Sequence, residues 1–343
     1  NILYAKCERN VLEMNDRKLS LVTDFYELTM SNGYFENNMQ DTIAYFDVFF
    51  RQVPDNGGYV ICSGLEQIID YIKNLKFDSD DISYLRSLNK FSDNFLDYLS
   101  HFKFTGDIWA IPEGTVVFPQ EPLITVRAPI IEAQILETMI LMIINHQCLI
   151  ATKSSRIVSS AKGRPVMEFG ARRAHSVDAA VFGARAAIIG GCVGTSCTYT
   201  AKEFDTVASG TMAHSFIQSF DSEYDAFKAY AEMYPDDCIL LIDTYDTINS
   251  GIVNAIKVFN DILIPKGFRP KGVRLDSGDL AYLSKKVRKI LDNAGFEDCK
   301  ICVSNSLDEN LISSLLEQGA QIDSFGVGEN LITAKSDPVF GGV

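Results

Sequence analysis

The stretch from residue 272 to residue 279, Gly-Val-Arg-Leu-Asp-Ser-Gly-Asp, holds the residues best suited to chemistry. Arg274 and Asp276 alternate with apolar neighbours, so we expect them on one face of a strand. A fixed arginine suits a phosphate or pyrophosphate, and a carboxylate beside it suits ribose hydroxyls or a Mg²⁺ ion. A structural Arg–Asp pair followed by an aspartate helix cap explains the same residues about as well.

A second candidate phosphate site lies near the C-terminal end, in Phe-Gly-Val-Gly-Glu-Asn at 325–330. Gly326 and Gly328 would let backbone N–H groups approach an anion at the start of a helix. A tight turn between a strand and a helix is the plainer explanation. Ser304 and Asn305 end the preceding apolar run, and barrels commonly bind phosphate in the loops after their last strands. This pairing favours the anion interpretation.

The sequence Glu-Phe-Gly-Ala-Arg-Arg at 168–173 ends another apolar run. Two adjacent arginines, Arg172 and Arg173, suggest an anion in an acidic protein, and the ring of Phe169 could stack on a planar ligand. A solvated loop with a phenylalanine in the core is the alternative. For this motif taken alone, the alternative is the better prediction.

His214 stands in Gly-Thr-Met-Ala-His-Ser, at the expected end of a strand. A histidine there could act as an acid or a base, or accept a phosphoryl group as a nucleophile. Asp243 and Asp246, in Ile-Asp-Thr-Tyr-Asp, could orient it and fix its tautomer. The other three of the 4 histidines are predicted to be structural. No two histidines have metal-ligand spacing, so no protein-held metal site is predicted.

The elements that must position these residues follow a regular pattern. Short apolar runs recur from 165 to 328, each followed by polar or glycine residues and a helical stretch, as in βα units. The polar residues cluster at the C-terminal ends of the runs: Glu168, Thr195, His214, Asp243, Asp276 and Asn305. A (β/α) barrel collects such ends around one site, whereas a doubly wound sheet uses only the strands beside its switch point. The pattern therefore favours the barrel.

The domain organisation follows from this change of pattern. Residues 1–130 mix helical and β-rich segments and are predicted to form an N-terminal α/β domain. Residues 131–343 are predicted to form the barrel domain. The chain stops at Gly-Gly-Val, where another strand could begin, so we expect the barrel domain to be truncated at its C-terminus.

Composition narrows the class of partner. The chain has 343 residues and a formal net charge of −14, which disfavours nucleic acid and anionic lipid but not a small anion held by a local arginine cluster. The most apolar stretch, 139–144, is too short to span a bilayer, and no signal peptide is visible. The 8 cysteines sit mostly in apolar runs and are expected to be free thiols. These features predict a cytoplasmic protein.

Taken together, the motifs resemble those of the nicotinate phosphoribosyltransferases, within the type II phosphoribosyltransferase group. The resemblance runs across nearly the whole chain and keeps the order of the motifs. It rests on Thr-Asp-Phe-Tyr-Glu-Leu-Thr from residue 23, Tyr-Phe-Asp-Val-Phe-Phe-Arg from 45, Leu-Ile-Asp-Thr-Tyr-Asp-Thr from 241, and the four motifs above. It implies an irregular (β/α) barrel with an N-terminal α/β domain, in a homodimer whose active sites are shared between subunits.

The resemblance also implies roles for residues. Tyr26 from the partner subunit would stack on the pyridine ring opposite Phe169, and Arg172 would hold the carboxylate side of the ring. Thr195 and Ser196 would contact the substrate at the next strand end. Arg274 and Asp276 would bind phosphoribosyl pyrophosphate, with Mg²⁺ assisting the pyrophosphate. The 5′-phosphate would be held by Ser304, Asn305, Gly326 and Gly328. Arg51 would reach phosphates from the partner subunit. His214, oriented by Asp243, would be transiently phosphorylated by ATP.

The implied reaction joins nicotinate to phosphoribosyl pyrophosphate to give nicotinate mononucleotide, a step in NAD biosynthesis. Cys197 and Met212 depart from the family pattern, in which Asn and His are often found, and put the coupling to ATP in doubt. Ser196 offers no carboxylate for an amide, which favours the acid. The alternatives are a nicotinamide or quinolinate enzyme, a barrel lyase or aldolase acting on phosphorylated sugars, and a non-catalytic nucleotide-binding regulator.

Overall fold

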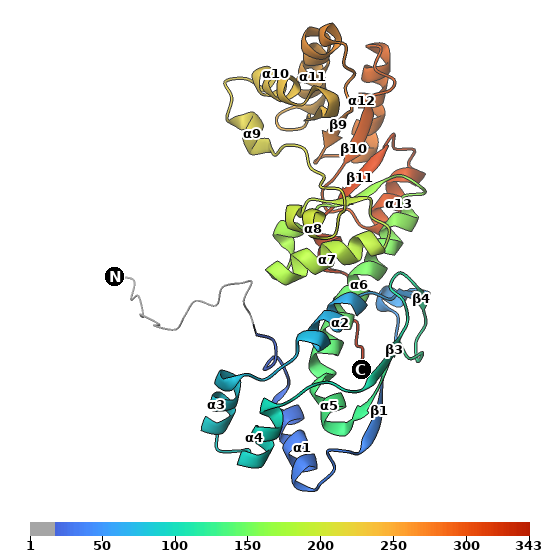
Figure 1. Ribbon diagram of the computed structural model, residues 1–343. Helices are drawn as coiled ribbons and strands as arrows, with labels where there is room; N and C mark the ends of the chain where they lie inside the picture. Colours follow the sequence, from blue (N-terminus) through green and yellow to red (C-terminus); the bar gives the residue numbers. More distant parts are fainter. Residues whose placement is uncertain (1–17) are drawn as a thin grey trace, which may run out of the picture.

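The computed structural model describes residues 18–343, which form two halves joined by one long helix (Figure 1). The first half begins with α1, whose N-cap residue is Asp24, although the Asp24 side chain makes no capping hydrogen bond. Its helices are α1 (Phe25–Glu36), α2 (Leu65–Asn74), α3 (Ser79–Ser87) and α4 (Asp93–Ser100). Its strands are β1 (Ile43–Val48), β2 (Val60–Ile61), β3 (Asp107–Ala110), β4 (Val116–Val117) and β5 (Ile124–Pro129).

The strands of this half form a three-stranded antiparallel sheet in the order β1-β5-β3, and β2 pairs with β4. On one face Tyr45, Arg127 and Asp107 lie side by side across the three strands. Arg127 donates to the Tyr45 hydroxyl at 3.0 Å and pairs with Asp107 at 3.1 Å. The opposite face buries β-branched residues such as Val126, so the alternation of the sequence sets which face packs on the helices.

Helices α5 (Ile130–Ile135) and α6 (Glu137–Ser160) make a continuous run of 31 residues from the first half into the second (Figure 1). The apolar stretch 139–144, which is too short to span a bilayer, lies inside this run, and the whole run is long and apolar enough to cross a membrane by length and composition. In the structure 61% of its most apolar window is buried against the rest of the chain. The apolar residues of this helix therefore belong to the protein core.

The second half carries a six-stranded parallel sheet in the order β7-β6-β11-β10-β9-β8. The strands are β6 (Val166–Glu168), β7 (Gly194–Thr195), β8 (Ile239–Leu241), β9 (Gly272–Leu275), β10 (Lys300–Val303) and β11 (Ser324–Val327). The helices are α7 (Val177–Ile189), α8 (Thr198–Glu203), α9 (His214–Gln218), α10 (Glu223–Met233), α11 (Ile252–Val258), α12 (Leu280–Asn293), α13 (Glu309–Glu317) and α14 (Glu329–Ile332). Asp279 caps α12 by accepting from the Tyr282 N–H at 3.0 Å, as predicted.

Strands that follow one another in the chain are neighbours in the sheet, as in a barrel, except that β7 and β8 are not paired. The last strand, β11, pairs with the first, β6, which a doubly wound sheet does not require. The segment at 206–214 adds only a bridge from Ala208 to Thr195 instead of the predicted strand. Within residues 18–343 no ladder joins that segment to β8, so closure of the barrel stays a prediction. The apolar run that ends at Thr195 forms a strand only at its last two residues, because α7 extends to Ile189 and β7 begins at Gly194.

The C-terminal residues return to the first half, where Figure 1 shows the end of the chain beside α5 and β3. Val343 and Phe49 exchange two backbone hydrogen bonds of 2.8 and 2.9 Å, and Gly342 forms an antiparallel bridge with Phe50. The ring of Phe340 packs on that of Phe50, with centroids 5.0 Å apart. The division predicted at residue 130 follows the change in sequence pattern, whereas the last residues of the chain pack against the first half.

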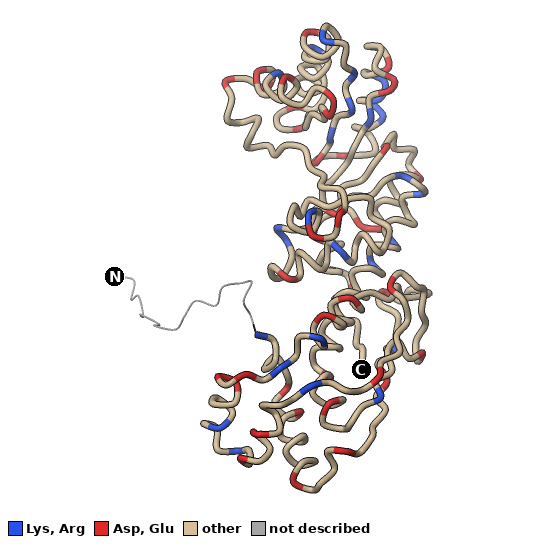
Figure 2. The backbone as a smooth tube through the Cα atoms, in the orientation of Figure 1, with Lys and Arg blue, Asp and Glu red and all other residues tan. Residues whose placement is uncertain are grey.

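Charged residues occur in both halves, and most of the described cysteines are buried. Figure 2 shows acidic and basic residues spread over both halves. All seven cysteines in residues 18–343 are free, and six of them are buried, including Cys299 and Cys302 of the Cys-x-x-Cys sequence. Cys7 lies outside the described residues.

Candidate active site

Arg274, on β9, is the centre of the contacts among the predicted site residues. Its Nε donates to the Ser304 hydroxyl at 2.9 Å, and one terminal nitrogen pairs with Asp276 at 3.1 Å. The other terminal nitrogen donates to the Thr211 hydroxyl at 3.1 Å and to the Met212 carbonyl at 3.3 Å. One half-buried guanidinium thus joins the ends of β9 and β10 to the loop before His214.

Asp276 lies between this arginine and the histidine. Its Oδ1 accepts a short hydrogen bond from the Ser304 hydroxyl and also faces Arg274. Its Oδ2 is 3.5 Å from Nε2 of His214. The alternation predicted for residues 274 and 276 therefore places both side chains toward one site.

His214 begins the short helix α9, and its Nδ1 lies 3.1 Å from the Thr244 hydroxyl. The predicted contact with Asp243 is absent. The Asp243 Oδ2 instead accepts from the Asp276 N–H at 2.7 Å and the Ser277 hydroxyl at 2.6 Å. Its Oδ1 is buried and has no hydrogen-bond partner within residues 18–343. Asp243 therefore holds the turn after β9 and lies next to His214 only through Asp276.

Phe169 lies beside Gly326, which is in β11, and Gly328, which follows that strand. The Phe169 N–H donates to the Val327 carbonyl at 2.7 Å, and its ring lies against Gly326, where an added Cβ would sit 2.4 Å from a ring carbon. A Cβ on Gly328 would be 3.0 Å from the Phe169 carbonyl oxygen. The ring centroid is 5.9 Å from the Arg274 guanidinium carbon. The glycines thus allow the aromatic ring to reach the arginine.

The loop after β10 is shaped by two consecutive residues with positive φ, Asn305 at 89° and Ser306 at 51°. Both are exposed, and the buried Ser304 precedes them. Left-handed backbone exposes N–H groups at a turn and can form a concave site for an anion. This loop lies at the same sheet edge as Gly326 and Gly328, because β10 and β11 are parallel neighbours.

Thr195, which is predicted to contact the substrate, is buried beneath the loop after β7. Its hydroxyl is fully buried and donates to the Glu168 carboxylate at 2.6 Å. Ser196, the next residue, is exposed. Burial raises the pKa of Glu168, although hydrogen bonds from Thr195 and the Gly170 N–H oppose the shift.

Three predicted residues make no hydrogen bond or ion pair with this cluster within residues 18–343. Arg172 is exposed and has no ion pair among residues 18–343. Arg51 is exposed in the first half and lines a cavity of about 800 Å³ with the loop 52–57 and the C-terminal segment. Tyr26, on α1, is 44% exposed and donates to Glu137, which raises the pKa of its phenol.

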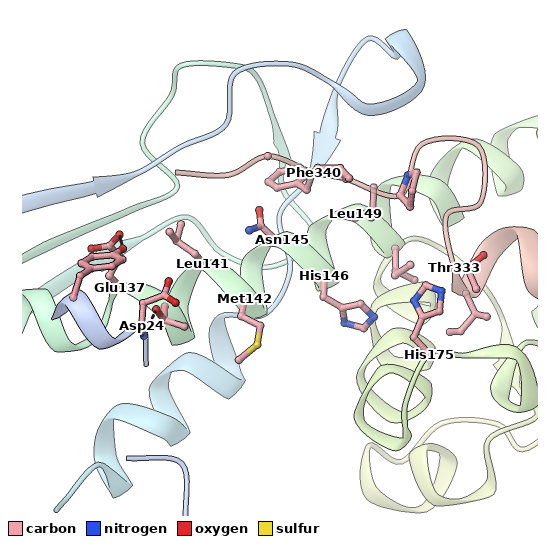
Figure 3. A pocket seen from close by; sticks show the side chains of 17 residues that line it. Asp24, Glu137, Leu141, Met142, Asn145, His146, Leu149, His175, Thr333 and Phe340 are labelled. Atoms are coloured by element: carbon pink, nitrogen blue, oxygen red, sulfur yellow. Dashed lines mark hydrogen bonds between the residues drawn. The ribbon is translucent and has the colours of Figure 1, made fainter. Parts of the chain in front are cut away.

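Tyr26 borders a cavity of about 540 Å³ between α1, α6 and the C-terminal segment (Figure 3). His146, from α6, and His175, from the loop before α7, point toward one another there. Burial first and His175 second lower the pKa of His146, and its Nε2 is buried with no hydrogen-bond partner among residues 18–343. Asp24, Glu137 and Gly341 are among its lining residues, but none of the residues that meet around Arg274 lines it.

Sequence reasoning missed Thr211 and Thr244 as members of the site. Thr211 shortly precedes His214, and Thr244 directly follows Asp243. A threonine near a candidate catalytic residue is a weak signal. Their partners lie 63 and 30 residues away in the chain, so only the strand order brings the groups together.

An arginine, a carboxylate, a histidine and an aromatic ring therefore meet at the carboxyl edge of a parallel α/β sheet, a combination suited to an enzyme that binds an anion. The N-terminal domain model of nicotinate phosphoribosyltransferases matches residues 21–145, and the model of the nicotinate phosphoribosyltransferase family matches residues 165–337. The chain belongs to the nicotinate phosphoribosyltransferase family.

Individual relatives agree with this assignment. The chain is 46% identical over 319 residues to nicotinate phosphoribosyltransferase pncB2 of Mycobacterium tuberculosis, covering 93% of this chain and 68% of that protein. It is 47% identical over 328 residues to nicotinate phosphoribosyltransferase of Bacillus subtilis, covering 96% of this chain and 66% of that protein. The chain thus spans about two thirds of the length of these relatives.

Solved structures show the same architecture. The crystal structure of human nicotinic acid phosphoribosyltransferase superposes with a TM-score of 0.84 at 27% identity, covering 94% of this chain and 73% of that chain. A nicotinate-nucleotide pyrophosphorylase from Pyrococcus furiosus superposes with a TM-score of 0.78 at 26% identity, covering 98% and 77%.

Proposed function

We propose that the protein joins nicotinate to phosphoribosyl pyrophosphate, giving nicotinate mononucleotide and pyrophosphate in the biosynthesis or salvage of NAD, with ATP hydrolysis coupled through His214. The observation that carries the proposal is the set of contacts of Arg274. Its guanidinium contacts Ser304, Thr211, Asp276 and the Phe169 ring, which supports a shared site for a phosphate and a pyridine ring.

The sugar–phosphate end of the substrate would meet Arg274, Asp276 and the loops after β10 and β11. A guanidinium has five donors in a fixed fork, and phosphate oxygens can replace the Thr211 and Ser304 hydroxyls as acceptors. Asn305, Gly326 and Gly328 would present backbone N–H groups to the 5′-phosphate together with Ser304. Asp276 would accept from the ribose hydroxyls.

The pyridine ring would lie on Phe169, with Ser196 and Arg172 beside the carboxylate. Tyr26 and Arg51 are exposed and remote from Arg274 in their own chain, so they would reach the site of a second subunit in a homodimer. The nitrogen of nicotinate attacks C1 of the sugar as pyrophosphate leaves. The enzyme contributes alignment and stabilisation of the charge that develops.

His214 would carry the phosphoryl group from ATP. If Nδ1–H donates to the Thr244 hydroxyl, Nε2 keeps its lone pair and can act as the nucleophile. Its side chain is 38% exposed, so it can be reached by a nucleotide. Asp276 lies 3.5 Å from Nε2, and Asp243 would act by holding the backbone of Asp276.

Residues near Arg274 fit a Mg²⁺ ion that arrives with the substrate. Within residues 18–343 no group of three or more His, Cys, Asp or Glu residues could hold a metal alone. Mg²⁺ needs only one or two carboxylates besides substrate oxygens, and the free Oδ1 of Asp243 and the carboxylate of Asp276 can supply these. When bound, Mg²⁺ neutralises charge on the departing pyrophosphate.

The pairing of β11 with β6 supports an irregular (β/α) barrel with the site at the carboxyl ends of its strands. The buried free thiols support a reducing compartment such as the cytoplasm. We expect no nucleic acid or membrane partner.

A product assay tests the proposal. Purified protein is mixed with Mg²⁺, phosphoribosyl pyrophosphate and either nicotinate or nicotinamide, with and without ATP, and mononucleotide is measured. We expect product from nicotinate, more of it with ATP, and loss of the ATP enhancement in His214→Ala. His101→Ala, which changes an exposed histidine at the end of α4, is the matched control and should behave as the unmodified protein. Product from nicotinamide alone would refute the substrate assignment.

A further inference from the structure

Glu168 is a carboxylate buried beneath the candidate site without an opposite charge. Its side chain is 0% exposed and ends β6, one residue before Phe169. Among residues 18–343 no lysine, arginine or histidine pairs with it. Burying an acid beside neutral partners is costly, and chains tend to keep such violations at functional sites. The Arg274 network leaves this residue unexplained.

The partners of Glu168 belong to two loops that line the site. One carboxylate oxygen accepts a short hydrogen bond from the Gly170 N–H, and the other accepts from the Thr195 hydroxyl at 2.6 Å. The same threonine oxygen accepts from the Cys197 N–H at 2.9 Å. The Ser196 N–H donates to the Glu168 carbonyl at 2.8 Å. The carboxylate therefore fixes the loop after β6 and the loop after β7 relative to each other.

The packing around these bonds leaves little room for adjustment. A Cβ on Gly170 would lie 2.7 Å from the Glu168 carboxylate and 2.6 Å from Cβ of Ile332. The Phe169 ring is held on its other side by Gly326. A change in the position of the carboxylate would therefore move either the Phe169 ring or the Ser196 loop.

We propose that Glu168 is a positioning residue. Through the Thr195 hydroxyl it sets the distance between the ring-binding Phe169 and the exposed Ser196. This distance in turn sets the preference for a pyridine carboxylic acid over its amide. The inference rests on the proposed function and deepens it. Glu168 is fully buried and acts through its neighbours, and Thr195 is assigned to the same positioning role instead of to substrate contact.

Four substitutions in the full chain separate positioning from general stability. Thr195→Val keeps the shape and removes the donor to Glu168, whereas Thr195→Ser keeps the donor. Thr200→Val is the matched control, because Thr200 is equally buried and donates to the Val181 carbonyl at 3.1 Å in the packing of α8 on α7. Glu168→Gln keeps the size of the acid and loses one acceptor. KM and kcat are measured for nicotinate, nicotinamide and phosphoribosyl pyrophosphate.

Loss of a hydrogen bond to a buried carboxylate predicts a change of about tenfold. We expect Thr195→Val to lower kcat/KM for nicotinate by about that factor, mainly through KM, and to reduce the preference for nicotinate over nicotinamide. KM for phosphoribosyl pyrophosphate should stay within about twofold. Glu168→Gln should follow Thr195→Val, and Thr195→Ser and Thr200→Val should resemble the unmodified enzyme.

Unchanged nicotinate kinetics in Thr195→Val, equal rises in the KM of both substrates, or the same defect in Thr200→Val would overturn the positioning role. An unmodified protein that makes no mononucleotide would refute the proposed function separately. Calorimetric titration with nicotinate would then decide the positioning role. The Thr195→Val variant must bind nicotinate about tenfold more weakly than the Thr195→Ser variant. Equal affinities, or no binding of nicotinate, would refute the positioning role.

Discussion

Substituting Gly326 by alanine tests the contact between the glycine turn and the aromatic ring. The added Cβ would lie 2.4 and 2.6 Å from two carbons of the Phe169 ring. Ordinary carbon contacts are about 3.5–4.0 Å, so the ring must move by about 1 Å. The φ of Gly326 is not positive, so backbone strain does not contribute.

The size of the effect follows from this displacement. Overpacking of a filled site costs about 1–3 kcal/mol of folding free energy. A misplacement of about 1 Å can lower turnover by about 10²-fold. We therefore expect Gly326→Ala to lower kcat/KM for nicotinate by about 10²-fold and to destabilise the protein by about 2 kcal/mol.

The assay is a double-mutant cycle with Phe169→Ala, using urea unfolding for stability and steady-state kinetics for activity. In the absence of the ring, Gly326→Ala should cost less than about 0.5 kcal/mol, because the clash has no partner. Gly58→Ala is the control, since nothing lies within 4 Å of its Cβ position. Equal costs of Gly326→Ala with and without the Phe169 ring would refute the reasoning.

Two further predictions concern groups outside the site. Lys153 is 4% exposed and contacts Asp55 at 3.1 Å and Glu309 at 2.9 Å, and Arg156 lies 3.3 Å from each carboxylate. Lys153→Met should remove the more buried of these two cations and lower the unfolding free energy by about 3 kcal/mol, and an unchanged urea midpoint would be the contrary result. Burial lowers the pKa of His146, so the unfolded state binds the proton more tightly and stability is lost as the pH falls below about 6.5. His146→Gln should therefore lose less Tm between pH 7 and pH 5.5 than the unmodified protein, and parallel Tm curves would contradict this.

The sequence was a good guide to residues that share a strand end. Arg274 and Asp276 were placed together because alternation along one strand is a local property. The Asp279 cap and most βα units followed from equally local signals. The partners of His214 could not be read in the same way, because its approach to Thr244 depends on how loops after two strands meet.

Two expectations failed for physical reasons that the sequence hides. The apolar run after residue 187 is buried as the end of a helix, and periodicity in so short a run does not distinguish helix from strand. Asp243 was assigned to the histidine by chemical preference, but the backbone N–H of Asp276 and the Ser277 hydroxyl lie closer and occupy the carboxylate oxygen. The roles of Tyr26 and Arg51 depend on a second subunit and stay predictions.

The return of the C-terminal residues to the first half has a consequence for how the protein unfolds. A fragment that begins after residue 130 would lack Phe49 and Phe50, and Val343, Gly342 and Phe340 would lose the backbone and ring that they pair with. The first half alone would expose the Phe50 ring, on which Phe340 packs in the whole chain. Neither piece should be stable by itself, and heating the whole chain should give one calorimetric transition shared by both halves.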